Sequence, residues 1–341
     1  MIRTIFKFLF LCLLTLVGCK SNDEPYEPKT PVYNTLTRLT GDTTDVTTVT
    51  LSGTCLMGGS TDVDDAFKWL IARSGGGDFV VIRSDISYGY NSYIRKLGTT
   101  NSVETIIIQS DSDALNPLVA KKIRNAEALF IAGGDQADYV RLWRNTPVED
   151  AINYLINTKH APVGGTSAGC AILGSSYFAA LKGSITSDEA MRNPYNSLVS
   201  LGHDDFITNP FLQNTITDQH YSQRSREGRL VTFMARMDKD LNKNPRGIAV
   251  DEETAVCIDE NGVANVFGNN NAFFLQRTSS SPEICLVNTA LTWNKNMQAV
   301  KVFRISGSSA GNGSFDLKDN STAVGGEWLY YYIDNGIFYS H

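Results

Sequence analysis

Histidine and cysteine are scarce in this chain, and the cysteines do not form metal-binding pairs. The 341 residues include four histidines and six cysteines. The cysteines occupy positions 12, 19, 55, 170, 257 and 285, so no C-x-x-C spacing is present and no zinc site is expected. The last four stand in apolar segments, which favour buried free thiols, although an oxidising compartment would also permit a disulfide.

The chain also lacks an excess of positive charge and a hydrophobic run long enough to span a bilayer. Its net charge of -6 gives no general attraction to nucleic acid or to anionic lipid. The longest apolar run, Phe8–Val17, is too short for a stable transmembrane helix. A hydrophobic content of 42% supports a substantial core, and this length suits one large α/β domain or two smaller ones.

The N-terminal residues have the layout of a bacterial export signal. Basic residues precede the apolar run, so residues 1–18 are predicted to be a signal peptide. Leu16-Val17-Gly18-Cys19 resembles a lipobox, in which Cys19 would be lipidated; a plain signal peptide is the alternative. Residues 19–45 begin polar, acidic and proline-containing, which predicts a tether. We therefore expect an exported protein, lipid-anchored to the cell envelope on its periplasmic or surface face.

Strand-like and helix-like segments alternate in the first half of the chain. Buried strands are predicted at Asp78–Arg83, Glu104–Gln109 and Ala128–Ala132, with helical patterns between them. This alternation predicts an α/β fold with a doubly wound, mostly parallel sheet. Reacting groups gather at the carboxyl ends of such strands. The glycine-marked turns at Gly58-Gly59 and Gly133-Gly134-Asp135-Gln136 should therefore meet in one crevice.

The pattern changes beyond Leu181. Residues 183–196 are predicted to be a loop, and 224–236 a helix. Antiparallel strands are predicted at 247–250, 254–259 and 264–267. We expect residues 46–275 to form the main domain and residues 276–341 a β-rich C-terminal extension.

The stretch from Ala161 to Gly174 has the form strand, tight turn, helix. Its centre is the pentapeptide Gly165-Thr166-Ser167-Ala168-Gly169, which matches G-x-S-x-G. A serine at such a turn is exposed at the sheet edge, next to a helix N-terminus that favours developing negative charge. The pattern fits a nucleophile elbow or a glycine-rich structural turn.

A serine nucleophile needs a base, and four histidines permit selection by elimination. His341 is the terminal residue, and His160 precedes the elbow strand at the end opposite the serine. His203 lies in a surface-like Gly-His-Asp-Asp segment, which leaves His220 as the best candidate base.

The carboxylate that would orient this histidine is less clear from the sequence. Asp188 and Glu189 lie between Ser167 and His220, giving the chain order Ser, acid, His of α/β hydrolytic folds. Competing carboxylates are Asp135, Asp218 and Asp251. The basic residues that follow the histidine, Arg224, Arg226 and Arg229, form a solvated helix face or hold a substrate carboxylate bidentately.

Four sequence blocks together carry a family resemblance. They are Gly133-Gly134-Asp135-Gln136, Gly164-Gly165-Thr166-Ser167-Ala168-Gly169, Asp218-Gln219-His220-Tyr221 with the three arginines and Gly228-Arg229-Leu230, and Gly247 to Ala255. In this order, over roughly residues 50 to 270, they look like cyanophycinase and its peptidase S51 relatives. The resemblance implies a flavodoxin-like or class I glutamine amidotransferase-like fold and a Ser-His-Glu triad that releases β-Asp-Arg from cyanophycin.

The resemblance also suggests residue roles. It implies Ser167 as nucleophile, His220 as base, Gln136 and Gln219 as substrate contacts, and Arg224, Arg226 and Arg229 as basic residues near the pocket. We choose Glu189 as the triad acid, with Asp188 in reserve, and expect backbone N–H groups of Ala168 and Gly134 to form the oxyanion hole.

These assignments describe a serine-type hydrolase that needs no metal or organic cofactor. Its substrate would be an acidic or β-aspartyl (isoaspartyl) peptide, with cyanophycin itself left open. The membrane is a partner through the lipid anchor, nucleic acid is not a partner, and a homodimer is compatible with the sequence. A catalytically silent surface lipoprotein that binds acidic peptides, or a serine esterase, are the alternative functions.

Overall fold

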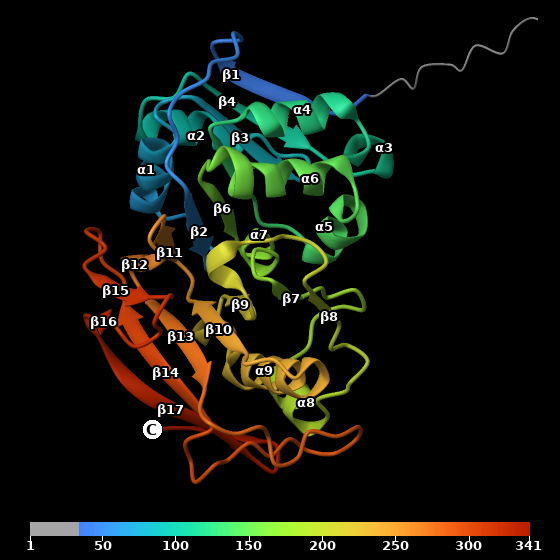
Figure 1. The fold of residues 1–341 in the computed structure, drawn as a ribbon. Helices are drawn as coiled ribbons and strands as arrows, with labels where there is room; N and C mark the ends of the chain where they lie inside the picture. The colour runs from blue at the N-terminus through green and yellow to red at the C-terminus, as the bar shows by residue number, and fades with distance from the viewer. Residues whose placement is uncertain (1–33) are drawn as a thin grey trace, which may run out of the picture. The chain divides into compact units, whose positions relative to one another are not determined.

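Five parallel strands form the centre of the first of two β-sheets in the computed structural model, which describes residues 34–341 (Figure 1). In spatial order the strands of this sheet are β1 (Thr37–Gly41), β4 (Ser102–Ile107), β3 (Asp78–Arg83), β5 (Ala128–Ile131), β6 (Val163–Thr166), β2 (Gly53–Met57), β11 (Thr254–Asp259), β12 (Val263–Gly268), β15 (Gly313–Asp316) and β16 (Ala323–Val324). The strands β4, β3, β5, β6 and β2 are parallel. Strand β1 at one end of the sheet, and β11, β12, β15 and β16 at the other, pair antiparallel with their neighbours.

The second sheet is built from the later part of the chain. Its spatial order is β18 (Ile337–Ser340), β17 (Gly326–Asp334), β14 (Val300–Ser306), β13 (Asn271–Arg277), β10 (Arg246–Val250), β9 (Thr215–Gln219), β7 (Ser176–Phe178) and β8 (Leu201–His203). Strand β9 is parallel to both β7 and β10, and the remaining pairs are antiparallel.

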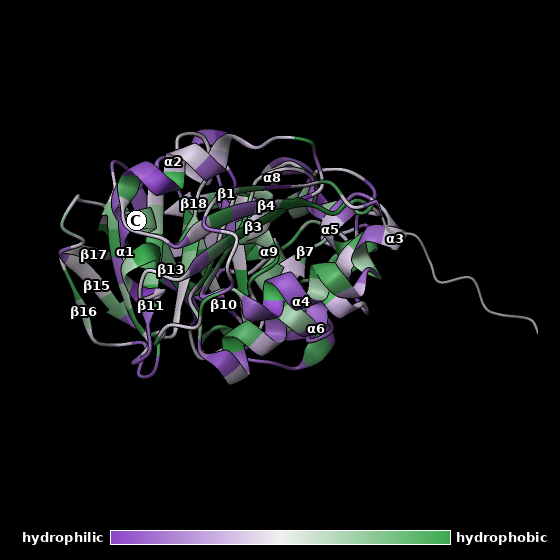
Figure 2. Cartoon of the chain, turned by 90° about the horizontal axis from the view of Figure 1, so that it is seen from above, coloured by the Kyte–Doolittle hydropathy of each residue, from purple (hydrophilic) through white to green (hydrophobic). Residues whose placement is uncertain are grey.

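Helices cover both faces of the parallel strands. The helices are α1 (Asp64–Arg73), α2 (Gly89–Leu97), α3 (Asp111–Ala114), α4 (Pro117–Asn125), α5 (Gln136–Trp143), α6 (Pro147–Tyr154), α7 (Ala168–Ala171), α8 (Ser187–Arg192) and α9 (Glu227–Leu241). Side chains alternate along β3, so Phe79 and Val81 pack with α1 and α2, whereas Val80 and Ile82 face the core under α4 and α6. Helices α1, α4 and α6 accordingly carry both hydrophobic and hydrophilic residues (Figure 2).

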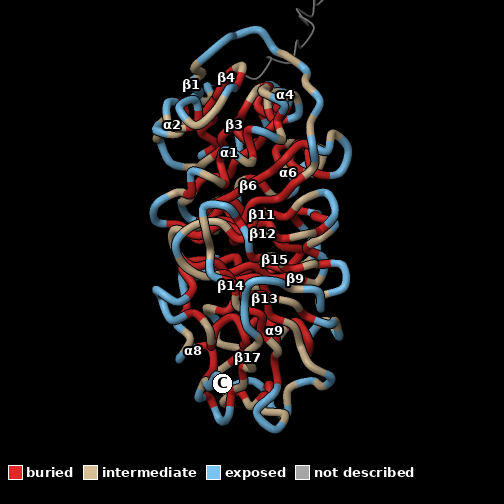
Figure 3. Tube along the Cα trace, turned by 90° about the vertical axis from the view of Figure 1, so that its left-hand side faces the viewer, coloured by how far each residue is buried: buried red, intermediate tan, exposed pale blue. Residues whose placement is uncertain are grey.

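The two sheets share a hydrophobic core. Val256 and Ile258 of β11 belong to the same buried cluster as Ile248 and Val250 of β10 and Phe274 of β13. The opposite face of the second sheet packs against α9, in a cluster that includes Leu230 and Phe233. Buried segments therefore run continuously through the centre, and exposed loops lie at the periphery (Figure 3).

Local sequence signals explain where the helices on one face begin. Asn116 accepts a hydrogen bond from the N–H of Leu118, and Pro117 occupies the first turn of α4. Thr146 and Pro147 begin α6 in the same way. A capping side chain followed by proline satisfies or removes N–H groups that have no partner in the helix.

The predicted fold class is confirmed. The structure is an α/β fold with a parallel central sheet, and its C-terminal part is rich in β-strands. Strands at Asp78–Arg83 and Thr254–Asp259 have the predicted bounds. Burial of four free thiols, at Cys55, Cys170, Cys257 and Cys285, also agrees with the sequence.

Three parts of the predicted organisation are wrong. The predicted tether extends too far, because Thr37–Gly41 pairs with β4 as an edge strand. Residues 276–341 are no separate extension, since β14 pairs with β13 along its whole length. Residues 183–196 are not only loop, because Ser187–Arg192 forms a helix.

Strand β10 also differs from its predicted place. It does not form an antiparallel set with β11 and β12, because it lies in the second sheet, parallel to β9. The predicted signal peptide, Cys19 and residues 19–33 of the predicted tether lie outside the described residues. Within residues 34–341, no helix combines the length and apolar character needed to cross a membrane.

Removing residues 278–341 should prevent folding. The truncation would expose β13 along its full length and remove β14 and β17 from the α9 core. We expect almost no soluble, folded protein, measured as soluble yield and a cooperative thermal transition by circular dichroism. A control that ends at Asp334 loses only the edge strand β18 and should fold. A folded shorter protein would show that residues 278–341 are a dispensable extension.

Candidate active site

Ser167 lies on a strained turn between β6 and α7. Its φ of 50° and ψ of -115° fall where non-glycine residues are rare. A Cβ added to Gly165 would lie 2.6 Å from the carbonyl carbon of Gly169, and one added to Gly169 would lie 2.1 Å from the carbonyl oxygen of Ile131. The two glycines are therefore required for this tight turn, as in a nucleophile elbow.

His220 faces this serine from the end of β9. Its Nε2 lies 2.7 Å from Ser167 Oγ, and the side chain is buried. The N–H of His220 donates to the carbonyl of Gly58 at 2.8 Å. A Cβ added to Gly59 would lie 2.3 Å from His220 Cε1, so only glycine leaves room for the imidazole here. The Gly58-Gly59 turn and the serine turn thus lie side by side, with His220 in contact with both.

Glu252 is the carboxylate next to His220. Its Oε1 lies 2.7 Å from His220 Nδ1. Glu252 follows β10, and the parallel register pairs Val250 of β10 with Gln219 of β9. The residues just beyond these two strand ends are therefore neighbours, which brings Glu252 to His220. The chain order in the structure is serine, histidine, carboxylate.

The carboxylates predicted for this position lie elsewhere. Glu189 and Thr186 form the capping box of α8, and the Glu189 side chain is exposed. Asp188 is also exposed and pairs with Arg192 at 3.0 Å. Both belong to a helix N-terminus, where acidic residues are stabilising. The prediction of Glu189 with Asp188 in reserve is thus not supported by their positions.

The three competing carboxylates also have other partners. Asp135 caps α5 by accepting from the N–H of Ala137. Asp251 accepts from the N–H of Ser222 and holds the turn after His220. Asp218 pairs with an arginine of α9. Glu252 was overlooked although it stands in the Gly247–Ala255 block, because its proximity to His220 depends on a parallel pairing that the sequence does not reveal.

The other histidines do not form hydrogen bonds with Ser167. His203 Nδ1 lies 3.0 Å from Ser176 Oγ on β7, so it is not simply a surface residue. His160 precedes the amino end of β6, opposite the serine.

Burial lowers the pKa of His220, and Arg224 and Arg226 add to the lowering, whereas Glu252 opposes it. The imidazole is therefore neutral, as a base must be, at neutral pH.

Backbone N–H groups surround the serine. Ala168 is the first residue of α7, so its N–H has no acceptor within the helix. A Cβ added to Gly133 would lie 3.4 Å from Ser167 Cβ, which places the Gly133-Gly134 turn beside the serine. The N–H of Ser167 itself donates to the carbonyl of Met57. The Gly133-Gly134 turn and the first residue of α7 thus lie beside Ser167, and Ala168 and Gly134 stay predicted oxyanion-hole donors.

Gln136, Gln219 and Arg224 lie around the same crevice. Gln136 begins α5 directly after the Gly133-Gly134 turn and is half-buried. Gln219 is 4% exposed, and within residues 34–341 no hydrogen-bond partner meets its Oε1. The Arg224 side chain is 53% exposed, with Nε 4.0 Å from Glu252 Oε1. Gln136 and Arg224 are thus accessible to a ligand, whereas the Gln219 side chain is buried.

Arg226 and Arg229 have a different environment. Arg229 is buried and holds Asp218 bidentately, with Nε to Oδ2 at 2.8 Å and Nη2 to Oδ1 at 2.5 Å. Arg226 donates to the carbonyl of Gln219 at 2.6 Å. Their guanidinium groups stabilise the strand that carries His220. Neither predicted role, solvated helix face or direct substrate contact, agrees with these contacts.

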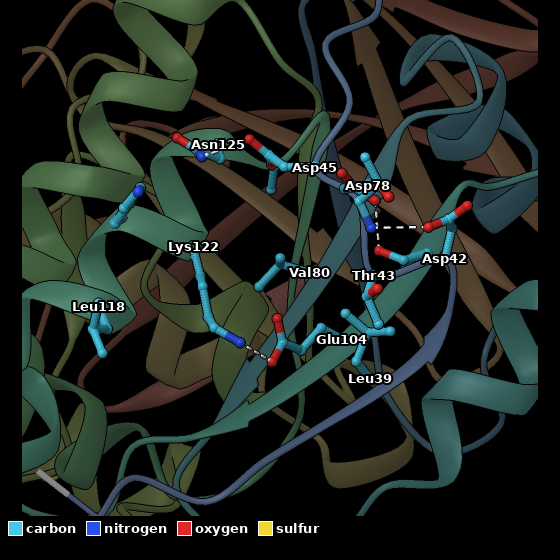
Figure 4. Close-up of a pocket in the computed structure, with 14 residues that line it drawn as sticks. Leu39, Asp42, Thr43, Asp45, Asp78, Val80, Glu104, Leu118, Lys122 and Asn125 are labelled. Atoms are coloured by element: carbon cyan, nitrogen blue, oxygen red, sulfur yellow. Dashed lines mark hydrogen bonds and ion pairs between the residues drawn. The ribbon is translucent and has the colours of Figure 1, made fainter.

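Two cavities lie at opposite ends of the parallel strands. One, of about 340 Å³, is lined by Asp62, Asp64, Arg83, Tyr90 and Tyr93 and follows the Gly58-Gly59 turn. The other, of about 320 Å³, lies by the amino ends of β3 and β4 and contains the Glu104–Lys122 ion pair (Figure 4). The first cavity lies at the carboxyl ends of β2 and β3, the end of the sheet at which Ser167 follows β6, although Ser167 does not line it.

Across residues 34–341, no three histidine, cysteine, aspartate or glutamate side chains come together as they would around a metal ion.

A serine on a strained strand–helix turn, hydrogen-bonded to histidine and through it to a carboxylate, defines the class of serine hydrolases on an α/β fold. The model of peptidase family S51 matches residues 87–266, more than half of the chain. The chain belongs to peptidase family S51. All three side chains of the hydrogen-bonded series lie within the matched residues.

Named relatives are similar over part of their length. The chain is 28% identical to the cyanophycinase of Synechococcus elongatus over 182 residues, which cover 53% of this chain and 51% of the relative. It is 26% identical to the cyanophycinase of Trichormus variabilis over 176 residues, covering 52% and 54%. The chain thus spans about half the length of the curated relatives it matches.

Solved structures of similar proteins include a peptidase from an acI-B1 Actinobacterium. It is 16% identical, with a TM-score of 0.49, and the match covers 70% of this chain and 98% of that one. A putative peptidase E protein from Listeria monocytogenes is also 16% identical, with a TM-score of 0.42 and coverage of 64% and 98%.

Replacing Asp218 by asparagine should destabilise the fold. The change leaves the buried guanidinium of Arg229 without its carboxylate, which costs about 3 kcal/mol in the free energy of unfolding. Urea unfolding followed by circular dichroism measures this cost. Arg224→Ala is the control, because its exposed side chain should change stability by less than about 0.5 kcal/mol. Equal stability of both variants would contradict the structural role of the Asp218–Arg229 pair.

Proposed function

We propose that this protein is a serine-type peptidase that hydrolyses β-aspartyl peptide bonds, with Ser167, His220 and Glu252 as its triad. The observation that carries the proposal is the pair of 2.7 Å contacts that join Ser167 Oγ to His220 Nε2 and His220 Nδ1 to Glu252 Oε1. Membership of peptidase family S51 supports peptide bonds as the substrate class.

The hydrogen bonds suggest a proton path. With Nδ1 protonated and donating to Glu252, Nε2 accepts the proton of Ser167 Oγ as the oxygen attacks the carbonyl carbon. The N–H groups of Ala168 and Gly134 would stabilise the oxyanion. The imidazolium then protonates the leaving amine, and water, deprotonated by His220, hydrolyses the acyl-enzyme. Glu252 stabilises the imidazolium during both steps.

Polar groups in the crevice support a β-aspartyl substrate. A β-aspartyl unit carries a free α-carboxylate, a suitable partner for the exposed guanidinium of Arg224. The buried Oε1 of Gln219, which has no hydrogen-bond partner within residues 34–341, is a candidate acceptor for an N–H of the substrate. The relatives in Synechococcus elongatus and Trichormus variabilis are named cyanophycinase, which supports cyanophycin as a substrate to test first.

Charge near the crevice supports a basic residue in that substrate. Asp62 lines the cavity that follows Gly58-Gly59, and burial raises its pKa to about 6, so its carboxylate is ionised at neutral pH. The guanidinium of Arg83 in the cavity wall is held bidentately by Asp85 at 2.9 and 2.7 Å. The Asp62 carboxylate accepts a hydrogen bond from Tyr90 and also interacts with the charge of Arg83. Because Asp85 already pairs with Arg83, a cationic group of the substrate could still bind Asp62, with Tyr90 and Tyr93 as aromatic neighbours.

Activity-based labelling and hydrolysis assays test the triad together. A fluorophosphonate should label the wild type but not Ser167→Ala, which should also lose hydrolysis of β-Asp-Arg peptides. Glu252→Gln should lower kcat by roughly 10³- to 10⁴-fold, because the imidazolium loses its orienting charge.

Glu189→Gln is the matched control and should keep full activity, since Glu189 caps α8. Equal loss in both glutamate variants, or labelling that persists in Ser167→Ala, would reject this triad. Hydrolysis of simple esters without any β-aspartyl cleavage would instead identify a serine esterase, and no labelling at all would indicate a binding protein.

Asp62→Asn should reduce preference for a basic residue. We expect kcat/KM for β-Asp-Arg to fall about 10-fold, and kcat/KM for β-Asp-Leu to change less than twofold, because only the charged side chain loses an ionic partner. Asp65→Asn is the control, since Asp65 pairs with Lys68 on α1 and does not line the cavity. A parallel fall for both substrates would mean that Asp62 does not select for charge.

A further inference from the structure

Glu252 lies outside any helix or strand, although its carboxylate must meet His220 closely. It stands in the turn between β10 and β11. The next residue, Glu253, has a φ of 56°, a left-handed conformation that is unfavourable for a side chain of this size. A turn of this kind needs other contacts to keep a fixed geometry.

Two side-chain amides hold the Glu252 backbone from opposite sides. Gln223 Oε1 accepts the Glu252 N–H at 2.9 Å. Asn270 Nδ2 donates to the Glu252 carbonyl at 2.9 Å. Thr254 joins the same set, because its Oγ1 donates to the Glu252 carbonyl at 3.2 Å and accepts the Asn270 N–H at 3.0 Å. Both backbone polar groups of Glu252 are thus bound.

We infer that Gln223 and Asn270 are positioning residues, which fix the Glu252 backbone so that its carboxylate remains on His220 Nδ1. The inference rests on the proposed function of Glu252 as the triad acid. Gln223 belongs to the turn Ser222–Arg224, directly after His220, so its hydrogen bond ties the segment that carries the base to the one that carries the acid. Asn270 ties the carbonyl of the same residue to the chain that enters β13.

Exposure separates this role from core stability. The Gln223 side chain is exposed, and the bond to the Glu252 N–H is the contact that its oxygen makes. Losing the bond should therefore let Glu252 move without unfolding the protein. The neighbouring Ser222 is also exposed. Its backbone N–H donates to Asp251 and its carbonyl accepts from the N–H of Ser225, whereas its hydroxyl makes no hydrogen bond within residues 34–341. Ser222→Ala is consequently a matched control.

The charges that face His220 set the direction of the expected pKa change. Glu252 raises the pKa of His220, whereas burial and the charges of Arg224 and Arg226 lower it. If Glu252 loses its position, the lowering influences remain and the pKa of His220 falls. A purely structural side chain on the surface would not produce this shift.

The experiment compares Gln223→Met, which removes the acceptor oxygen at similar volume, with Gln223→Glu, which retains one. For Gln223→Met we expect kcat on β-Asp-Arg to fall about 10-fold, with KM within twofold, as for a small misplacement of a catalytic group. NMR titration of the His220 ring should show a lower pKa. Gln223→Glu should restore most of kcat, and its added charge should raise the pKa of His220. Asn270→Leu, which lacks the donor and adds no charge, should resemble Gln223→Met.

The titration keeps this inference distinct from the proposed function. If the wild type cleaves no β-aspartyl peptide, the proposed function fails, while a lower His220 pKa in Gln223→Met than in wild type and Ser222→Ala still supports positioning. If Gln223→Met keeps both wild-type kcat and the wild-type His220 pKa, the inference is wrong. Thermal unfolding confirms that each compared variant is folded.

Discussion

The parallel pairing of β9 with β10 is the interaction on which the candidate site depends. Its register sets Gln219 opposite Val250, so the next residues of both strands leave the sheet side by side. This register brings His220 and Glu252 together although 31 residues separate them in the chain, including the whole of α9. The helix is the crossover that parallel pairing requires.

Side chains alternate along β9, so neighbouring residues of this strand contact different helices. Asp218 points to α9, where Arg229 holds it in a buried bidentate pair. Thr217, on the other face, donates to the carbonyl of Cys170 in α7, the helix that begins at the serine turn. The Asp218–Arg229 pair fixes β9 to α9, and the Thr217 hydrogen bond fixes β9 to α7, which follows the serine turn. Together they set the position of His220 relative to Ser167.

The glycines of the turns around Ser167 allow close packing, because a side chain at these positions would clash with its neighbours. Gly59 leaves room for the His220 ring, and Gly165 and Gly169 allow the close approach of β6 and α7. Arginines near the site illustrate the opposite use of the same residue type: Arg224 remains exposed, whereas Arg226 and Arg229 are committed to the strand. The three arginines that the sequence groups together therefore differ in the structure: Arg224 is exposed, and Arg226 and Arg229 are buried and stabilise β9.

The sequence by itself determined the α/β class, the elbow around Ser167 and, by elimination, His220, because periodicity, glycine spacing and composition are local properties. It did not determine the carboxylate. The choice of Glu189 relied on chain order, but Glu189 caps its own helix, while Glu252 reaches His220 only through strand register. Register, the burial of Arg229 and the joining of residues 276–341 to both sheets are set by packing between distant segments, so only the tertiary structure decided them.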